Sequence, residues 1–200
     1  MRAAVVIRMV ALVASLPVAS ALAQSAPAKP KPTDLTNTQI EEAVKRGIAA
    51  LTPGVSVNDR LVSLADIAKY NVAVAVVARP EGPDPRSLSH DKITEIYYVL
   101  KGSGTQLTGT LVNGTHQDTS KTIGPGMSSE AALQNTTARK LGPGDIQIIP
   151  PGLGHRWQNI DAGGIQYLVF RVDPEKVLQV EAAAKRTVNL VIWSPSHLVT

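Results

Sequence analysis

Cysteine is absent from all 200 residues of the chain. This absence excludes disulfides, thiol catalysis and cysteine-ligated metal centres, so the fold must be stabilised by its core alone. The chain is long enough for one domain with a substantial core, and its size requires no second domain.

Concentrated positive charge is also missing. The formal net charge is +4, and without Arg2 and Arg8 it falls to +2. Lys29 and Lys31 lie apart from any other basic cluster. Because nucleic-acid surfaces need a basic patch or stripe, we expect no nucleic-acid partner.

Long apolar runs are confined to the first 23 residues. Arg2 and Arg8 give a positive start, residues 9–23 are mainly apolar, and Ala21-Leu22-Ala23 supplies a small-x-small cleavage site. This pattern predicts a signal peptide over residues 1–23, cleaved near Ala23, and export to the periplasm or the medium.

A signal anchor is the alternative interpretation of this run. Ser15, Pro17 and Ser20 interrupt it, and its length falls short of the ~20 apolar residues that a membrane span needs. We therefore expect no stable membrane insertion.

The next segment predicts a tether followed by a helix. Residues 24–35 begin QSAPAKPKPTD and offer nothing to bury, which is typical of a disordered proline- and lysine-rich linker. Thr36 and Gln39 have capping-box spacing, and apolar residues then recur at helical intervals, predicting a helix over 37–51. We expect residues 36–200 to form a single domain.

Short runs rich in β-branched residues follow and predict an all-β fold. They are separated by glycine, proline and aspartate, without intervening helices, which favours a sandwich or barrel. The predicted strands are 71–79, 95–101, 105–112, 145–150, 154–160 and 165–172.

The remaining segments are less regular. Residues 114–140 are polar and longer than a hairpin connection, so they predict either a lid or a plain surface loop. Asp173 and Pro174 suit the cap and first position of a helix over 175–185. Residues 187–193 predict a last strand.

Two motifs carry the chemistry of the sequence. The stretch GDIQIIPPGLGHRWQN contains one complete motif. Its spacing is glycine, five residues, proline, one residue, glycine, two residues, histidine, three residues and asparagine. The matching residues are Gly144, Pro150, Gly152, His155 and Asn159. This run resembles the second motif of the cupin superfamily.

The first cupin motif is matched with one exception. Its register gives Gly82, then Leu88 where a histidine is expected, then His90, Glu95 and Gly102. The first motif thus consists of Gly82 and the stretch LSHDKITEIYYVLKGSG, which begins at Leu88. The second motif covers residues 144–159. We interpret the first stretch as a β-hairpin.

The resemblance implies a double-stranded β-helix, or jelly-roll barrel, with its core at about residues 70–172. We expect the two helices predicted from the sequence to pack outside it. It also implies a divalent metal inside the barrel. Side chains two apart on a strand share a face, so positions 88 and 90 both point inward, and a turn brings Glu95 to the same cavity. His155 would complete the site.

Leu88 cannot ligate a metal, so the ligand set becomes His90, Glu95 and His155. Two imidazoles and a carboxylate suit Fe, Mn, Ni, Cu or Zn and form the facial triad of non-haem iron sites. The other histidines, His116 and His197, are expected to be solvated or locally bonded. Asp91 would face away from the cavity on a regular strand.

Strand alternation from Glu95 and His155 places Tyr97, Val99 and Trp157 on the inner face. We expect Val99 to belong to the core. Tyr97 and Trp157 carry polar groups and, with Leu88, are the candidates for a substrate pocket. Asn159 is expected to fix backbone.

The resulting hypothesis is an exported cupin that binds one metal and acts on a small organic molecule. No free base is apparent beside the ligands, which favours metal-centred, dioxygenase-like chemistry over isomerase or lyase chemistry, although Tyr97 as an acid keeps the latter open. The alternatives are a non-catalytic ligand-binding module, with or without metal, and a pure oligomerisation unit. The resemblance also implies a homodimer formed by sheet packing.

Overall fold

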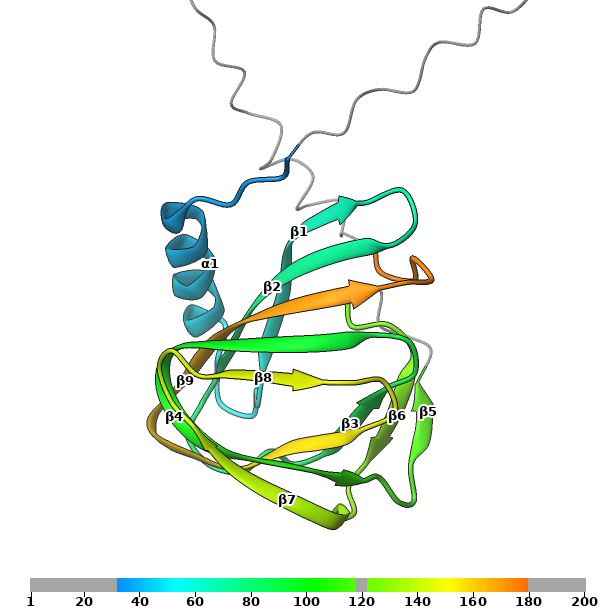
Figure 1. Ribbon diagram of the computed structural model, residues 1–200. Helices are drawn as coiled ribbons and strands as arrows, with labels where there is room; N and C mark the ends of the chain where they lie inside the picture. The colour runs from blue at the N-terminus through cyan, green and yellow to red at the C-terminus, as the bar shows by residue number, and fades with distance from the viewer. Residues whose placement is uncertain (1–31, 118–121, 180–200) are drawn as a thin grey trace, which may run out of the picture. The chain divides into compact units, whose positions relative to one another are not determined.

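The structure is a computed structural model that describes residues 32–117 and 122–179. Within these ranges it contains one helix followed by nine strands (Figure 1). The elements are α1 (Asn37–Ala49), β1 (Asn58–Asp66), β2 (Asn71–Arg79), β3 (Ser87–His90), β4 (Thr94–Thr110), β5 (Thr115–Gln117), β6 (Gly126–Ser129), β7 (Gln134–Leu141), β8 (Ile146–Ile149) and β9 (Gly154–Asp173).

Two long strands organise the barrel. β4 and β9 are antiparallel partners along most of their length, and their register is interrupted between Val99 and Gly104. Figure 1 shows both strands turning at the same side of the barrel. Their first and second halves therefore belong to two different faces. One face has the order β1-β2-β9-β4-β8, and the other has the order β7-β4-β9-β3-β6-β5. The all-β, double-stranded β-helix predicted from the sequence is confirmed.

The main core lies between these two faces. It combines small residues of β2, such as Ala73 and Ala75, with large buried side chains such as Trp157, Tyr167 and Ile165. Alternation along the strands produces this arrangement, because every second side chain points inward.

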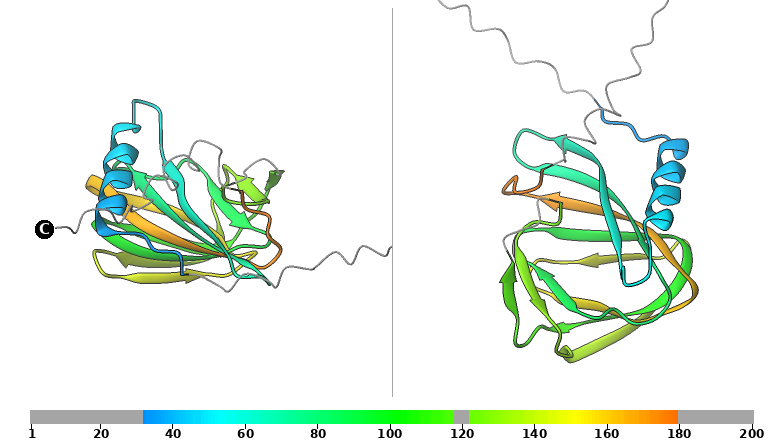
Figure 2. Two further views of the ribbon diagram at one scale, coloured as in Figure 1. Left: turned by 90° about the horizontal axis from the view of Figure 1, so that it is seen from above. Right: turned by 180° about the vertical axis from the view of Figure 1, so that it is seen from behind.

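Helix α1 packs on the outside of the barrel. The Thr36–Gln39 capping box begins it, and Ala43 joins Val76 and Leu168 in a second, smaller cluster. Figure 2 shows the helix against the outer face of the sheet that contains β2. Among the described residues no helix is long and apolar enough to span a bilayer.

The predicted hairpin over Leu88–Gly104 is wrong. β3 pairs with β6 and β9, whereas β4 pairs with β7, β8 and β9, so the two strands do not pair with each other. The turn between them carries the chain from one face of the barrel to the other. His90 and Glu95 therefore approach each other across the barrel interior.

The predicted loop over 114–140 is also corrected. Its described residues form β5, β6 and the start of β7, which complete the second face. The predicted pairs of strands 95–101 and 105–112, and 154–160 and 165–172, are in fact the single strands β4 and β9.

Several predictions lie wholly or partly outside the described residues. They are the signal peptide, most of the tether, His197, the strand over 187–193 and the second half of the helix over 175–185. The first part of that helix, residues 175–179, has no helical conformation in the structure.

Candidate metal centre

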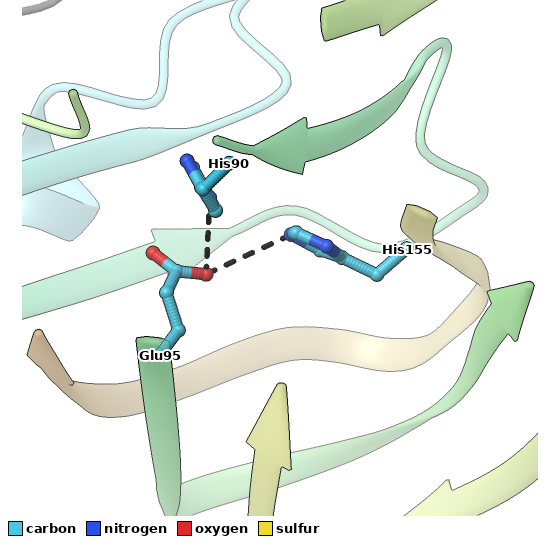
Figure 3. A group of neighbouring side chains, drawn as sticks. All are labelled: His90, Glu95 and His155. Atoms are coloured by element: carbon cyan, nitrogen blue, oxygen red, sulfur yellow. Dashed lines mark ion pairs between the residues drawn. The ribbon is translucent and has the colours of Figure 1, made fainter. Parts of the chain in front are cut away.

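Three strands bring His90, Glu95 and His155 together. His90 ends β3, Glu95 is the second residue of β4, and His155 is the second residue of β9. All three are buried, with exposed fractions of 5%, 2% and 5%. Figure 3 shows the two imidazoles directed at one oxygen of the Glu95 carboxylate.

Backbone contacts between the two sequence motifs hold this arrangement. The N–H of Gly152, in the turn before β9, donates to the carbonyl of His90 at 2.7 Å. Leu88 of β3 is the register partner of His155 of β9. The strand ends that carry the two histidines are thus joined by direct backbone contacts.

The three side chains meet the distance requirement of a metal site. Glu95 Oε2 lies 3.4 Å from His90 Nε2 and 3.6 Å from His155 Nε2. One ligand atom from each residue lies within 4.8 Å of the others. A first-row metal with ligands at about 2.0 to 2.3 Å separates neighbouring ligand atoms by roughly 3 to 3.7 Å. The donor set therefore fits such a metal in both spacing and chemistry.

The second oxygen of Glu95 is held by an arginine. Arg171 Nε donates to Glu95 Oε1 at 2.8 Å, and the same guanidinium pairs with Asp59 of β1. Tyr97 donates its hydroxyl proton to Glu95 Oε2 at 2.9 Å. Glu95 is therefore oriented with Oε2 alone facing the two histidines.

Electrostatics keep Glu95 and His155 in the protonation states that metal binding needs. Burial alone would raise the pKa of Glu95, but attraction to His90 and Arg171 outweighs it and holds that pKa well below its usual value. Burial lowers the pKa of His155 to about 4. At neutral pH Glu95 is thus a carboxylate and His155 a neutral imidazole.

The tautomer of His155 can be assigned from its surroundings. Its Nδ1 lies 3.2 Å from the carbonyl oxygen of Leu153, which can only accept a hydrogen bond. Nδ1 is therefore the protonated nitrogen, and the lone pair of Nε2 points at the centre.

A cavity opens beside the centre and reaches His155 and Tyr97. It has about 60 Å³ of space open to water molecules. Its lining includes the three predicted pocket residues, Leu88, Tyr97 and Trp157. Tyr97 and Trp157 are buried, and each ring packs against Tyr167 in a tilted arrangement, with centroid separations of 4.8 and 5.7 Å.

Comparison with known proteins agrees with this architecture. The sequence profile of the family described as Cupin matches residues 71–192, which is more than half of the chain. The chain belongs to the cupin family. A search of curated proteins found no match to this cupin.

Solved structures that the chain matches share little sequence with this cupin. A Klebsiella pneumoniae protein with a double-stranded β-helix domain is 17% identical, with 72% of this chain and 91% of that chain covered and a TM-score of 0.46. KdgF from Halomonas sp. is 16% identical, with 60% of this chain and 82% of that chain covered and a TM-score of 0.36. The DMSP lyase DddQ from Ruegeria pomeroyi is 19% identical, with 64% of this chain and 52% of that chain covered and a TM-score of 0.40. These similarities concern the fold alone.

The residues that the sequence discounted lie away from the centre of this cupin. Asp91 is exposed and accepts a contact from His116 Nε2 at 2.9 Å. Asn159 is exposed and its backbone is in register with Thr105 of β4. Val99 is part of the core.

Other buried or half-buried polar residues at this site were not anticipated. They are Arg171 and Asp59 beside Glu95, and Arg79, Asp84 and Gln106 around the cavity. Arg171 and Gln106 both lie on strands that the sequence predicted, at positions that alternate with exposed or half-buried neighbours. Alternation applied to polar residues would have identified them as inward-facing.

Proposed function

We propose that this cupin binds one divalent first-row transition metal through His90, Glu95 and His155 and acts on a small organic molecule held in the adjacent cavity. The observation that carries the proposal is the convergence of two buried imidazole nitrogens on one carboxylate oxygen. Iron, manganese, nickel, copper and zinc all suit this donor set.

A bound metal would supply Lewis acidity or a site for oxygen activation. The protein supports either role by leaving one side of the centre without a ligand. Leu88 occupies the position of the missing histidine and lines the cavity next to His155. A substrate in the cavity would therefore approach the centre from the side of Leu88.

The groups that could move a proton are few. Burial and the neighbouring Glu95 carboxylate raise the pKa of Tyr97 well above its usual value, so this hydroxyl stays protonated and can act as an acid but not as a base. Asp84, the carboxylate among the described cavity-lining residues, is paired with Arg79. This composition favours oxygenase-type chemistry at the metal over proton-shuttling isomerase or lyase chemistry.

A non-catalytic ligand-binding module is the second candidate function. Arg171 lies within hydrogen-bond distance of Glu95, so this carboxylate has a protein counter-charge without a metal. Such a centre could retain a ligand in the cavity with or without metal.

Metal analysis distinguishes these functions. The full chain is stripped with a chelator, offered iron, manganese, nickel, copper and zinc in turn, and analysed for bound metal. We expect one metal per chain, reduced at least tenfold in affinity in His155→Ala and unchanged in His116→Ala, whose histidine pairs with Asp91 at the surface. No stoichiometric metal in the parent would contradict the metal site and favour the binding module.

Export and self-association belong to the same proposal. Export rests on the positive start and apolar run of residues 1–23. A homodimer is supported by exposed apolar side chains on the outer face of β4 and β8, namely Tyr98, Ile146 and Ile148. Membrane fractionation of the expressing cells would test export, with release of a chain shortened near Ala23 as the expected result.

A further inference from the structure

Gln106 is a buried amide that the fold does not satisfy. Its side chain is 1% exposed, yet neither Oε1 nor Nε2 has a hydrogen-bond partner among the described protein atoms. Buried polar groups without partners destabilise a fold, so each one requires an explanation. Gln106 lies on β4 opposite Trp157 of β9 and lines the cavity beside the metal centre.

This situation differs from that of other buried amides in the described residues. Asn58 and Gln147 each have one side-chain oxygen without a partner, whereas both polar atoms of Gln106 lack one. Neither Asn58 nor Gln147 lines the cavity. Of these three amides, Gln106 is therefore the one beside the cavity of the candidate centre.

The charges around the cavity favour an anionic occupant. Arg79 and Arg86 line it together with a single carboxylate, Asp84. Arg79 Nε donates a hydrogen bond to the Tyr167 hydroxyl at 2.9 Å, and Arg79 Nη1 donates one to Asp84. These two hydrogen bonds engage two of the five N–H donors of the guanidinium group. Among the residues that line the cavity, two guanidinium groups, of which that of Arg86 is exposed, stand against one carboxylate and leave one positive charge in excess.

The shape of the cavity limits the ligand further. About 60 Å³ of space open to water molecules admits only a few heavy atoms. Leu88 and Trp157 provide apolar surface for a short carbon skeleton, while Gln106 and the arginines provide the polar contacts.

We propose that this cavity binds a small hydroxycarboxylate and that Gln106 recognises it through hydrogen bonds. Nε2 donates to an oxygen of the ligand, and Oε1 accepts from the ligand hydroxyl, so both unsatisfied atoms gain partners at once. Arg79 and Arg86 balance the carboxylate charge. The inference rests on the proposed function only in taking this cavity as the ligand site, since the contacts to Gln106 do not require a metal.

The test compares acids that differ by one hydroxyl. Binding of glycolate and lactate to the full chain is measured by calorimetry against acetate and propionate, first with the metal removed and then with metal restored. Because an unpaired buried amide discriminates against a ligand that lacks its hydrogen-bonding group, we expect at least one hydroxy acid to bind at least about tenfold more tightly than its counterpart.

Two substitutions assign this preference to Gln106. In Gln106→Leu the preference should fall below about twofold, while the melting temperature of the ligand-free protein rises by about 2 to 6 °C because two unsatisfied polar atoms are removed. Gln106→Glu keeps the size of the side chain and should weaken binding of both hydroxy acids through charge repulsion. Gln134→Leu, on the exposed face of β7, should change neither property.

The outcomes separate this inference from the metal site. If no hydroxy acid binds more tightly than its counterpart, or if Gln106→Leu and Gln106→Glu retain the parent preference, the inference is overturned. A fall in melting temperature in Gln106→Leu with the preference unchanged would assign Gln106 to the fold instead. Hydroxy acid preference without metal uptake would contradict the proposed metal function alone, and metal uptake without the preference would contradict this inference alone.

Discussion

Leu88 occupies the one motif position at which this chain departs from the ligand pattern of its family. It stands two residues before His90 on β3, in register with His155, and lines the cavity. A histidine at this position would point at the same centre as the three proposed ligands.

We therefore expect Leu88→His to bind metal at least about tenfold more tightly than the parent chain, because a fourth protein ligand is added to a preformed set. Competition with a chelator of known affinity measures the change. Ile148→His, which adds a histidine on the outer face of β8, is the matched control and should leave the affinity unchanged. Equal affinities in Leu88→His and the control would mean that this cavity holds no metal.

The protonation of His155 predicts how stability depends on pH. Burial lowers its folded-state pKa to about 4, whereas the unfolded chain has the ordinary value of 6.5. Below pH 6.5 His155 therefore binds a proton in the unfolded state but stays neutral in the folded state. The unfolding free energy consequently falls as the pH is lowered towards 4.

Over that interval the metal-free protein should lose about 3 kcal/mol of unfolding free energy through this residue. Urea unfolding of chelator-treated protein at pH 7, 6 and 5 measures the loss. His155→Asn should show a shallower dependence, and His116→Ala should keep the slope of the parent. A parent curve that is flat between pH 7 and 5 would contradict the buried neutral imidazole.

At the scale of the elements, Arg171 joins three strands. From β9 it pairs with Glu95 on β4 and Asp59 on β1, and it also donates to the carbonyl of Thr122 at 3.0 Å. Removing a single partner from a buried ion pair leaves the other charges uncompensated, and this effect is larger than the net contribution of the intact pair.

Arg171→Met should consequently lower the unfolding free energy by about 3 to 5 kcal/mol. Adding Glu95→Gln should restore part of this loss, because the uncompensated carboxylate is then removed. Chemical unfolding of the single and double variants measures both effects, with Arg60→Met on the exposed side of β1 as the control. A loss below about 1 kcal/mol in Arg171→Met would show that Glu95 is not held by this arginine.

The bend shared by β4 and β9 depends on close backbone approach. Gly102 has a φ of 77°, and an added Cβ would lie 2.0 Å from the carbonyl oxygen of Gly164. Gly144 has a φ of 88° but no atom within 4 Å of the same added carbon. The two positions share the strain of a positive φ and differ in the collision.

Gly144→Ala should therefore destabilise the protein by about 1 to 2 kcal/mol, and Gly102→Ala by at least about 2 kcal/mol more. Thermal unfolding of the two variants side by side measures the difference. Equal losses would mean that β4 and β9 can separate at the bend without a penalty.

The strands that could be predicted from the sequence are those whose buried residues form an apolar run or an apolar periodicity. β2 was predicted with its observed bounds because its apolar run is buried. β7 was missed because seven of its eight residues are exposed, which removes any apolar periodicity. β4 and β9 were each divided in two because their glycine-containing bends resemble turns, although the strands continue through them.

The candidate site also contains some residues that the sequence predicts and others that it does not. His90, Glu95 and His155 were predictable from two motifs with fixed gaps, and Leu88 stood out against them. Arg171 and Gln106 belong to no motif, and their roles depend on contacts with residues far away in the sequence. Strand alternation could have shown that both face inward, but their partners are known only once the strands are assembled into a barrel.

At the scale of the whole molecule, the outer face of β4 and β8 remains apolar. Ile146 and Ile148 are 54% and 64% exposed, and Tyr98 lies next to Ile146 in register. Contiguous exposed apolar side chains on a sheet are typical of an association surface.

We expect the chain to form a homodimer that Ile148→Lys converts to a monomer, because the substitution places a charge in the apolar face. Sedimentation velocity at several protein concentrations measures the change. Ile67→Lys, which alters an exposed isoleucine in the turn after β1, should leave the dimer intact. A parent chain that sediments as a monomer at all concentrations would contradict this use of the sheet.

The central claim is that His90, Glu95 and His155 ligate one metal together. X-ray absorption spectroscopy of the metal-loaded full chain tests it most directly, because the scattering reports the number and distance of imidazole ligands. The account predicts two imidazoles and one carboxylate oxygen at about 2.0 to 2.3 Å, with one imidazole lost in His155→Ala. A spectrum with no imidazole contribution, or one that is unchanged in His155→Ala, would contradict it.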